Sequence, residues 1–185
     1  MCYIQGVSKE SPMNHMRISA VLASLAALVA TGADVYVAAD GVDDSAAGRG
    51  TESSPYASIP YALAQLGAAS DGTIFIGEGS FVVNTNLTVT GAVKFIGEGR
   101  DKTFITREGT TYKNRKLFVL QNPGALVSDL AITNVYAQDV GGTSGCIVEF
   151  PNTAGAGAVS NLLVKGCTAG SAGAGYVIYI GTSAS

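Results

Sequence analysis

The chain of 185 residues is poor in charged residues, cysteine and histidine, and it has no tryptophan. Charged residues make up 14% of the sequence, and acidic residues outnumber basic ones. This negative balance gives no reason to expect a nucleic-acid partner. Beyond the N-terminal segment only Cys146 and Cys167 remain, which is too few for a disulfide framework. We expect both to be small buried residues, and a bridge between them is the alternative in an exported protein.

After residue 70 the sequence also lacks any helical spacing of apolar residues. It contains instead short β-branched and aromatic runs separated by glycine-rich stretches. Alternating strand–helix units are therefore not expected, and the pattern predicts an all-β fold.

These apolar runs recur as internal sequence repeats at regular offsets. Residues 75–79 and residues 95–99 share the sequence Phe-Ile-Gly-Glu-Gly at an offset of 20. Longer offsets relate three further pairs of segments: 116–119 with 145–148 (29), 145–148 with 175–178 (30), and 127–134 with 159–166 (32). Such periods indicate structural units that bury a core only against their neighbours. We predict a parallel β-helix of about three to four turns, each with two or three short strands.

Residues 1–33 are predicted to be a leader that contains a secretory signal. Arg17 precedes an uncharged apolar run at residues 18–30, and small residues follow at 31–33. The run is too short to span a bilayer, which needs ~20 apolar residues. A buried N-terminal helix is the alternative. The signal predicts a secreted or cell-surface protein, in which residues 34–185 form the folded domain.

One helix is predicted after the leader, at residues 58–66. Ser58 suits the N-cap position, and Pro60 suits the first turn. Residues 59, 62, 63 and 66 then form one apolar stripe. Stacked strands need a cover on their open end, and this helix comes directly before the repeats. We expect it to be that cap.

The segment around this helix resembles the N-terminal part of the right-handed parallel β-helix proteins of the pectin/pectate lyase-like superfamily. The residues that carry the resemblance are 34–37, the Asp40-Gly41 turn, 50–51, 55–59, 62–63, 71–74, Gly77 and Gly79. The resemblance covers residues 34–99, and the later turns share only the rhythm. The resemblance implies right-handed coiling. It is specific for the fold and not for an activity, because this N-terminal segment precedes many different enzymes and non-enzymes.

A basic stretch lies between Arg100 and Lys116 and holds six of the eleven basic residues. A protruding basic loop can hold an anionic polysaccharide such as a uronan, and a solvated charged loop is the alternative. The candidate substrate-binding residues are Arg107, Lys113, Arg115 and Lys116. In pectate lyases, which the chain resembles, a basic residue removes a sugar proton beside substrate-bound Ca²⁺. No strand here carries acids facing such a base, so no catalytic residue is assigned.

Three carboxylates within five residues, Asp40, Asp43 and Asp44, are the candidate metal ligands. Carboxylate oxygens are hard ligands that suit Ca²⁺, the one cofactor that the sequence brings into consideration. The spacing does not match the twelve-residue calcium loop. Asp and Gly are also what a turn requires, so a simple turn is the alternative.

Three further acidic residues invite a catalytic interpretation. Glu78 and Glu98 occupy equivalent places in the shorter repeat, and paired carboxylates serve glycoside hydrolysis. Solvated corner residues are the alternative for both. Asp129 aligns with Asn161 one repeat later. This pairing favours a corner side chain that bonds to the backbone over a catalytic acid.

Taken together, these features favour the N-terminal part of an exported β-helix protein that binds or degrades polysaccharide, with its catalytic turns outside this chain. An enzyme of this kind would be a polysaccharide lyase or a glycoside hydrolase. The alternative is a non-catalytic, adhesin-like or structural β-helix. The sequence stops soon after the apolar run at 176–180, so further turns or a partner are expected to cover that end.

Overall fold

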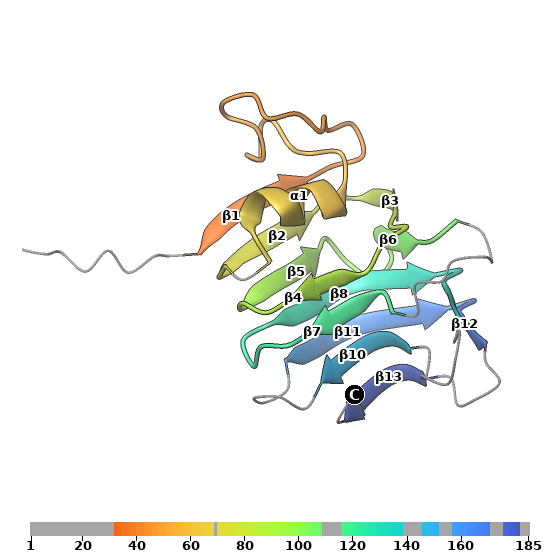
Figure 1. The fold of residues 1–185 in the computed structure, drawn as a ribbon. Helices are drawn as coiled ribbons and strands as arrows, with labels where there is room; N and C mark the ends of the chain where they lie inside the picture. Colours follow the sequence, from red (N-terminus) through yellow and green to blue (C-terminus); the bar gives the residue numbers. More distant parts are fainter. Residues whose placement is uncertain are drawn as a thin grey trace, which may run out of the picture.

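The computed structural model describes residues 32–68, 70–108, 116–138, 146–151, 157–170 and 176–181. Within these residues the protein is mostly β-structure with a single helix, as Figure 1 shows. The elements are β1 (Ala33–Val37), α1 (Ile59–Leu66), β2 (Gly72–Ile76), β3 (Gly79–Val82), β4 (Leu87–Val89), β5 (Val93–Gly97), β6 (Thr103–Thr106), β7 (Phe118–Leu120), β8 (Leu126–Thr133), β9 (Tyr136–Gln138), β10 (Cys146–Pro151), β11 (Ala158–Lys165), β12 (Thr168–Gly170) and β13 (Tyr176–Gly181).

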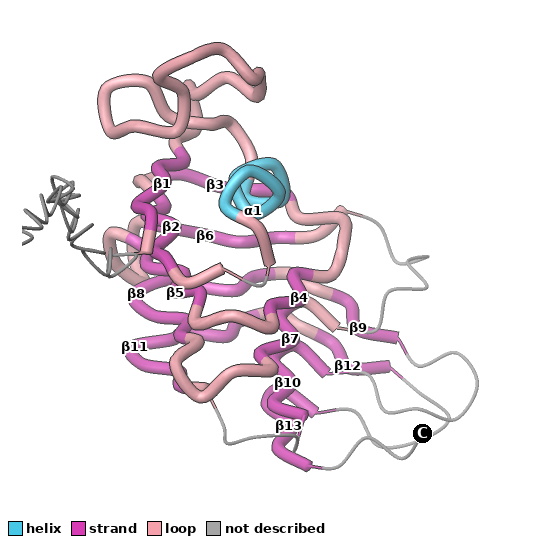
Figure 2. The backbone as a smooth tube through the Cα atoms, turned by 60° about the vertical axis from the view of Figure 1, so that its left-hand side comes forward, coloured by secondary structure: helices cyan, strands magenta, loops and turns pink. Residues whose placement is uncertain are grey.

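All pairings between these strands are parallel. From β2 onward a strand pairs with the strand three places later in the chain, so that β2 pairs with β5, β3 with β6, and β4 with β7. Strand β6 instead meets the second half of the long strand β8. The chain thus returns to the same sheet after about three strands, and the described sheets grow by stacking and curl together (Figures 1 and 2).

The 32-residue repeat is confirmed by the pairing of β8 with β11. Val127 pairs with Val159, and the register holds as far as Thr133 with Lys165. Asp129 and Asn161 lie in the middle of these strands with positive φ angles of 57° and 44°. The first half of β8 pairs with β5 and the second half with β6, so the sheet changes direction at this left-handed position.

The 20-residue repeat does not set the register of β2 and β5. Ile74 pairs with Phe95, an offset of 21, so the equivalence of Phe75 with Phe95 is wrong. A shift of one residue moves a side chain to the other face of a strand. Phe95 is therefore fully buried, whereas Phe75 lies on the outward face and is half-buried. The inward register is favoured because Phe95 packs edge-to-face on Phe118, with ring centroids 5.1 Å apart.

The offset of 29 between the runs at 116–119 and 145–148 is also wrong by one residue. Phe118 pairs with Val148, an offset of 30. The next step is confirmed, because Cys146 pairs with Tyr176, again 30 residues apart. Both side chains of the pair Phe118 and Val148 are fully buried, so the inward column of the core fixes this register.

The predicted helix is confirmed as α1. The Ser58 side chain accepts a hydrogen bond from the backbone N–H of Tyr61, and Pro60 lies in the first turn. Ile59, Ala62 and Leu63 are buried in the core cluster. The helix contacts β1 and β2 and lies over the end of the stack that β1 forms (Figure 2). This end is therefore covered.

The opposite end, formed by β11, β12 and β13, is different. Each of these strands pairs with one neighbour among the described residues. Ile178 and Ile180 continue the inward columns of Val148 and Phe150, yet they are 40% and 69% exposed, against 0% and 3% for their partners. These side chains point in the inward direction and have no layer above them in the described residues.

The predicted signal at residues 18–30 lies outside the described residues. Among the residues that are described, no helix has the length and apolar character needed to cross a membrane.

Candidate functional site

The outward face of β1, β2 and β5 carries a groove of about 230 Å³. Its lining residues are Tyr36, Val37, Ala38, Glu52, Pro55, Phe75, Ile76, Gly77, Ile96, Gly97 and Glu98. Strand residues form the floor, and the loop between β1 and α1 forms one wall through Glu52 and Pro55. Concave sites with apolar linings and a few polar groups are typical of ligand-binding sites.

An apolar strip runs across three strands in the floor of this groove. Tyr36 pairs with Phe75 in register, and Phe75 pairs with Ile96. The rings of Tyr36 and Phe75 are stacked, with centroids 5.1 Å apart and planes inclined by 24°. Neighbouring strands lie ~4.8 Å apart, so these three half-buried side chains form a continuous surface along the stacking direction.

Two carboxylates border the strip. Glu52 belongs to the loop, and Glu98 follows β5 directly. Both side chains are exposed. Gly77 also lines the groove, and a Cβ atom placed there would come within 3.8 Å of Glu98 Oε1. The missing side chain at Gly77 therefore keeps the space beside Glu98 open. The lining contains acidic groups and no basic ones.

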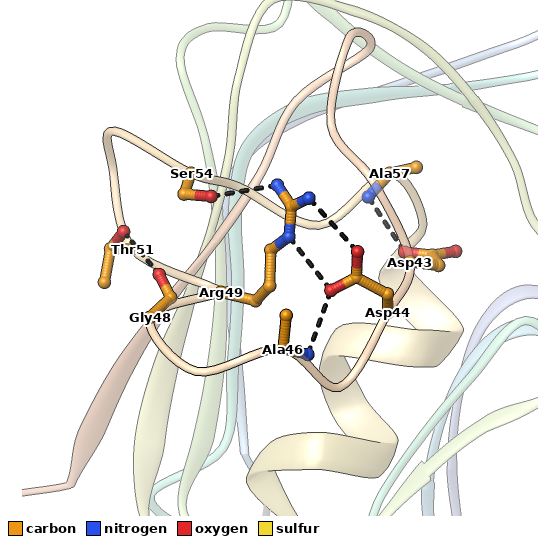
Figure 3. A network of polar contacts seen from close by, with 8 residues as sticks. All are labelled: Asp43, Asp44, Ala46, Gly48, Arg49, Thr51, Ser54 and Ala57. Atoms are coloured by element: carbon orange, nitrogen blue, oxygen red, sulfur yellow. Dashed lines mark hydrogen bonds and ion pairs between the residues drawn. The ribbon is translucent and has the colours of Figure 1, made fainter.

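The loop wall is held in place by backbone and side-chain bonds. The Tyr36 N–H donates to the Gly50 carbonyl, and the Tyr56 N–H donates to the Tyr36 carbonyl, each over 2.9 Å. Arg49 donates to both carboxylate oxygens of Asp44, over 2.9 and 3.1 Å, as Figure 3 shows. These Arg49 hydrogen bonds are the main reason that the pKa of Asp44 lies below its ordinary value. The wall is thus preorganised before any ligand arrives.

The predicted calcium ligands occupy the same loop. Asp43 accepts hydrogen bonds from the backbone N–H groups of Ala57 and Ser58, over 2.8 and 3.0 Å, and from the Ser58 hydroxyl, over 2.6 Å. Asp44 is engaged by Arg49, and Asp40 is exposed. In the described part of the chain no group of three His, Cys, Asp or Glu residues is placed to hold a metal ion. Calcium binding by Asp40, Asp43 and Asp44 stays a prediction.

Arg107, a predicted substrate-binding residue, lies inside the protein and is only 3% exposed. Its Nε donates to the Val83 carbonyl over 3.0 Å, and its Nη2 donates to the carbonyls of Thr85 and Lys116 over 2.9 and 3.0 Å. A guanidinium group spreads its donors in a fixed fork, which suits several carbonyls at once. The structure therefore gives Arg107 a structural role, contrary to the predicted surface role.

Of the other three basic candidates, only Lys116 belongs to the described residues. Lys116 forms an ion pair with Glu149, whose side chain is only 3% exposed. This ion pair places Lys116 beside a buried partner instead of on a cationic surface. Lys113 and Arg115 lie outside the described residues. Of the four candidates, the two that the structure describes, Arg107 and Lys116, both make contacts within the fold.

Glu78 and Glu98 do not occupy equivalent places, because β2 and β5 pair at an offset of 21 and not 20. Glu98 lines the groove, whereas Glu78 does not. The alignment of Asp129 with Asn161 is confirmed, and here the Asn161 side-chain amide donates to Asp129 Oδ1 over 2.8 Å. This bond, followed by one from Ser128, keeps the pKa of Asp129 below its ordinary value. Asp129 is a corner residue bonded to its neighbour in the next layer.

Cys146 and Cys167 are free thiols. Cys146 is buried, and Cys167 is half-buried. Burial is the main reason that the pKa of Cys146 rises from 9.0 to about 12, with nearby Glu149 as the second cause. The expectation of two small residues packed in the stack describes Cys146 well.

Comparison of the chain with family models, with curated proteins and with solved structures found no match.

The groove was missed by sequence reasoning. Tyr36 and Phe75 each read as one more apolar residue in a strand, and only the register places them side by side on the outward face. The usable signal was the alternation of Val35 and Val37 around Tyr36, which already assigns Tyr36 to the face opposite the core.

We predict that Arg107→Lys destabilises the protein by about 2–3 kcal/mol, because the single nitrogen of an ammonium group cannot reach three carbonyls that are spread around the guanidinium fork. The free energy of unfolding from chemical denaturation measures this loss. Arg100→Lys, at an exposed turn position, is the matched control and should leave stability unchanged. A stable Arg107→Lys variant that loses affinity for polygalacturonate would instead support the surface role.

Cys146 should resist alkylation in the folded protein well above pH 9. Its thiol keeps its proton until about pH 12, whereas the thiol of the unfolded chain ionises near its ordinary pKa of 9.0. Only the thiolate reacts with iodoacetamide, so native labelling should be roughly a hundredfold slower or more than labelling in denaturant at pH 9.

The same shift fixes the sign of a pH effect on stability. Below pH 9.0 the thiol is protonated in both states, and its contribution is fully present. Between 9.0 and about 12 the unfolded chain loses the proton first, so stability falls as pH rises. Peptide mapping of labelled Cys146 across this pH range measures the ionisation of the native thiol, on which this stability effect depends. A native labelling rate that already levels off near pH 9 would contradict the buried thiol.

Proposed function

We propose that this chain is part of an exported, right-handed parallel β-helix protein, of the kind found in the pectin/pectate lyase-like superfamily, and that it binds polysaccharide. The fold proposal is supported by strands that pair in parallel with the strand three places later. That pattern arises when each turn of a coil lies on the preceding one. The proposal concerns binding and assigns no reaction to these residues.

The groove on β1, β2 and β5 carries the functional proposal. It joins an apolar strip of stacked aromatic side chains to two carboxylates on an outward face. Sugar rings have apolar C–H faces and a rim of hydroxyl groups, and aromatic side chains with nearby acceptors match both features. The strip follows the stacking direction, so an extended polymer lying along it would touch successive strands.

Native electrophoresis of the full chain in gels that contain soluble polysaccharides tests this proposal. We expect the mobility to fall in at least one polymer and to be restored when an excess of its oligosaccharides competes. A gel without polymer and bovine serum albumin as a non-binding protein are the controls. Unchanged mobility across neutral, acidic and amino-sugar polymers would refute polysaccharide binding.

A structural or adhesin-like β-helix is the second candidate, and the use of the basic residues favours it. Arg107 holds backbone carbonyls, and Lys116 holds Glu149, so two predicted ligand-binding groups serve the stack itself. In this second candidate function, the edge formed by β11, β12 and β13 is the interaction surface. A parallel turn or a partner strand would cover the inward-pointing Ile178 and Ile180 there.

We expect the full chain to associate with itself through this edge when nothing else covers it. Ile180→Lys should shift the sedimentation coefficient toward that of a monomer, because the association would bury the lysine charge in an apolar contact. Val82→Lys, at an exposed apolar position of the edge strand β3, is the matched control. Equal sedimentation of Ile180→Lys and the unchanged protein over a wide concentration range would contradict the edge contact.

A further inference from the structure

We propose that the groove on β1, β2 and β5 is a subsite for one uncharged sugar ring of a polysaccharide and that it discriminates against uronic acids. This inference rests on the proposed polysaccharide binding and goes further by naming the class of sugar. It differs from the expectation drawn from the basic stretch, which pointed to an anionic polymer.

Charge is the first argument. The charged side chains that line the groove are Glu52 and Glu98, and both are exposed carboxylates. Two of the groups proposed to bind an anion lie elsewhere, since Arg107 is buried against carbonyls and Lys116 is paired with Glu149. A uronate ring in this groove would bring a third negative charge beside two carboxylates, and none of the described lining residues is a cation. The hydroxyl groups of an uncharged sugar would instead donate hydrogen bonds to the carboxylates.

Size and shape are the second argument. The groove measures about 230 Å³, which is below the ~300–1,000 Å³ of pockets that enclose drug-sized ligands. It is therefore suited to one ring of a chain that continues along the surface. Gly77 leaves the space beside Glu98 open, and Ile96 extends the apolar strip beyond Phe75. A polymer can thus place one ring in the groove and its neighbours along the strip.

Rigidity is the third argument. The groove wall is bonded to β1 through Gly50 and Tyr56, and the Ala38 N–H donates to the Tyr56 carbonyl over 2.9 Å. Arg49 and Asp44 close the loop behind it. Tyr36 and Phe75 support each other through their stacked rings. A preformed surface loses little conformational entropy when a ligand binds, which is what a shallow site for a polar ligand needs.

The test compares neutral and acidic polymers with matched variants of the full chain. The neutral probes are hydroxyethylcellulose, xyloglucan, galactomannan and dextran, and the acidic probes are polygalacturonate and alginate. Dissociation constants come from the mobility in native gels of graded polymer content. We expect binding to at least one neutral polymer and markedly weaker binding to both acidic ones.

Phe75→Ala should weaken the neutral interaction by about tenfold or more, because it removes half of the stacked pair. Phe104→Ala is the matched control, since Phe104 is also a half-buried phenylalanine of the same sheet but does not line the groove. Its affinity should stay unchanged. Glu98→Gln, at an exposed position, should weaken neutral binding and relieve the discrimination against polygalacturonate.

The outcomes separate this inference from the proposed function. Neutral binding that falls in Phe75→Ala and holds in Phe104→Ala supports both. Neutral binding that neither Phe75→Ala nor Glu98→Gln alters overturns the groove assignment and leaves polysaccharide binding intact. Preference for the acidic polymers overturns the sugar class while binding itself stands. Failure to bind any of the polymers overturns both.

Discussion

The parallel register between neighbouring strands decides which side chains this protein buries and which it presents. Side chains alternate between the two faces of a strand, so the register of one strand assigns every residue of the next. On the inward side it aligns Val35, Ile74 and Phe95, and on the outward side it aligns Tyr36, Phe75 and Ile96. Core and groove are therefore two consequences of one alignment.

The two ends of the stack use this alignment differently. At one end, the edge of β1 receives backbone bonds from the loop at Gly50 and Tyr56, and α1 adds Ile59, Ala62 and Leu63 to the core. At the other end, the inward columns continue into Ile178 and Ile180, which remain exposed in the described residues. The covered end also carries the groove, because the same loop supplies Glu52 and Pro55.

Local features were predictable from the sequence because their signals are local. Ser58 and Pro60 mark the start of α1, and the 32-residue alignment of β8 with β11 includes polar residues that can match in only one way, such as Asp129 with Asn161. Register in the apolar strands was not predictable to the residue. In β2 and β5 both faces carry large apolar residues, so an identical sequence at an offset of 20 matched as well as the observed offset of 21.

The candidate site could not be predicted from the sequence, because it depends on burial and on strand pairing in the folded chain. Charge density drew attention to the basic stretch, yet burial turned Arg107 into a bond donor for three carbonyls, and burial depends on the folded chain. Tyr36 and Phe75 are 39 residues apart and become a surface only through the pairing of β1 with β2. Carboxylates in the loop looked like metal ligands, whereas Asp43 and Asp44 mainly bond the loop to itself and to the start of the helix.

The register of β2 against β5 is the most direct test of this account, and nuclear Overhauser effects between assigned side chains measure it. The account predicts cross-peaks from Ile74 to Phe95, from Phe95 to Phe118, and from the Tyr36 ring to the Phe75 ring. Such a pattern places Phe95 in the core and Phe75 on the outward face. Cross-peaks between the Phe75 and Phe95 rings, without those from Ile74 to Phe95, would mean the 20-residue register and would remove both the core and the groove described above.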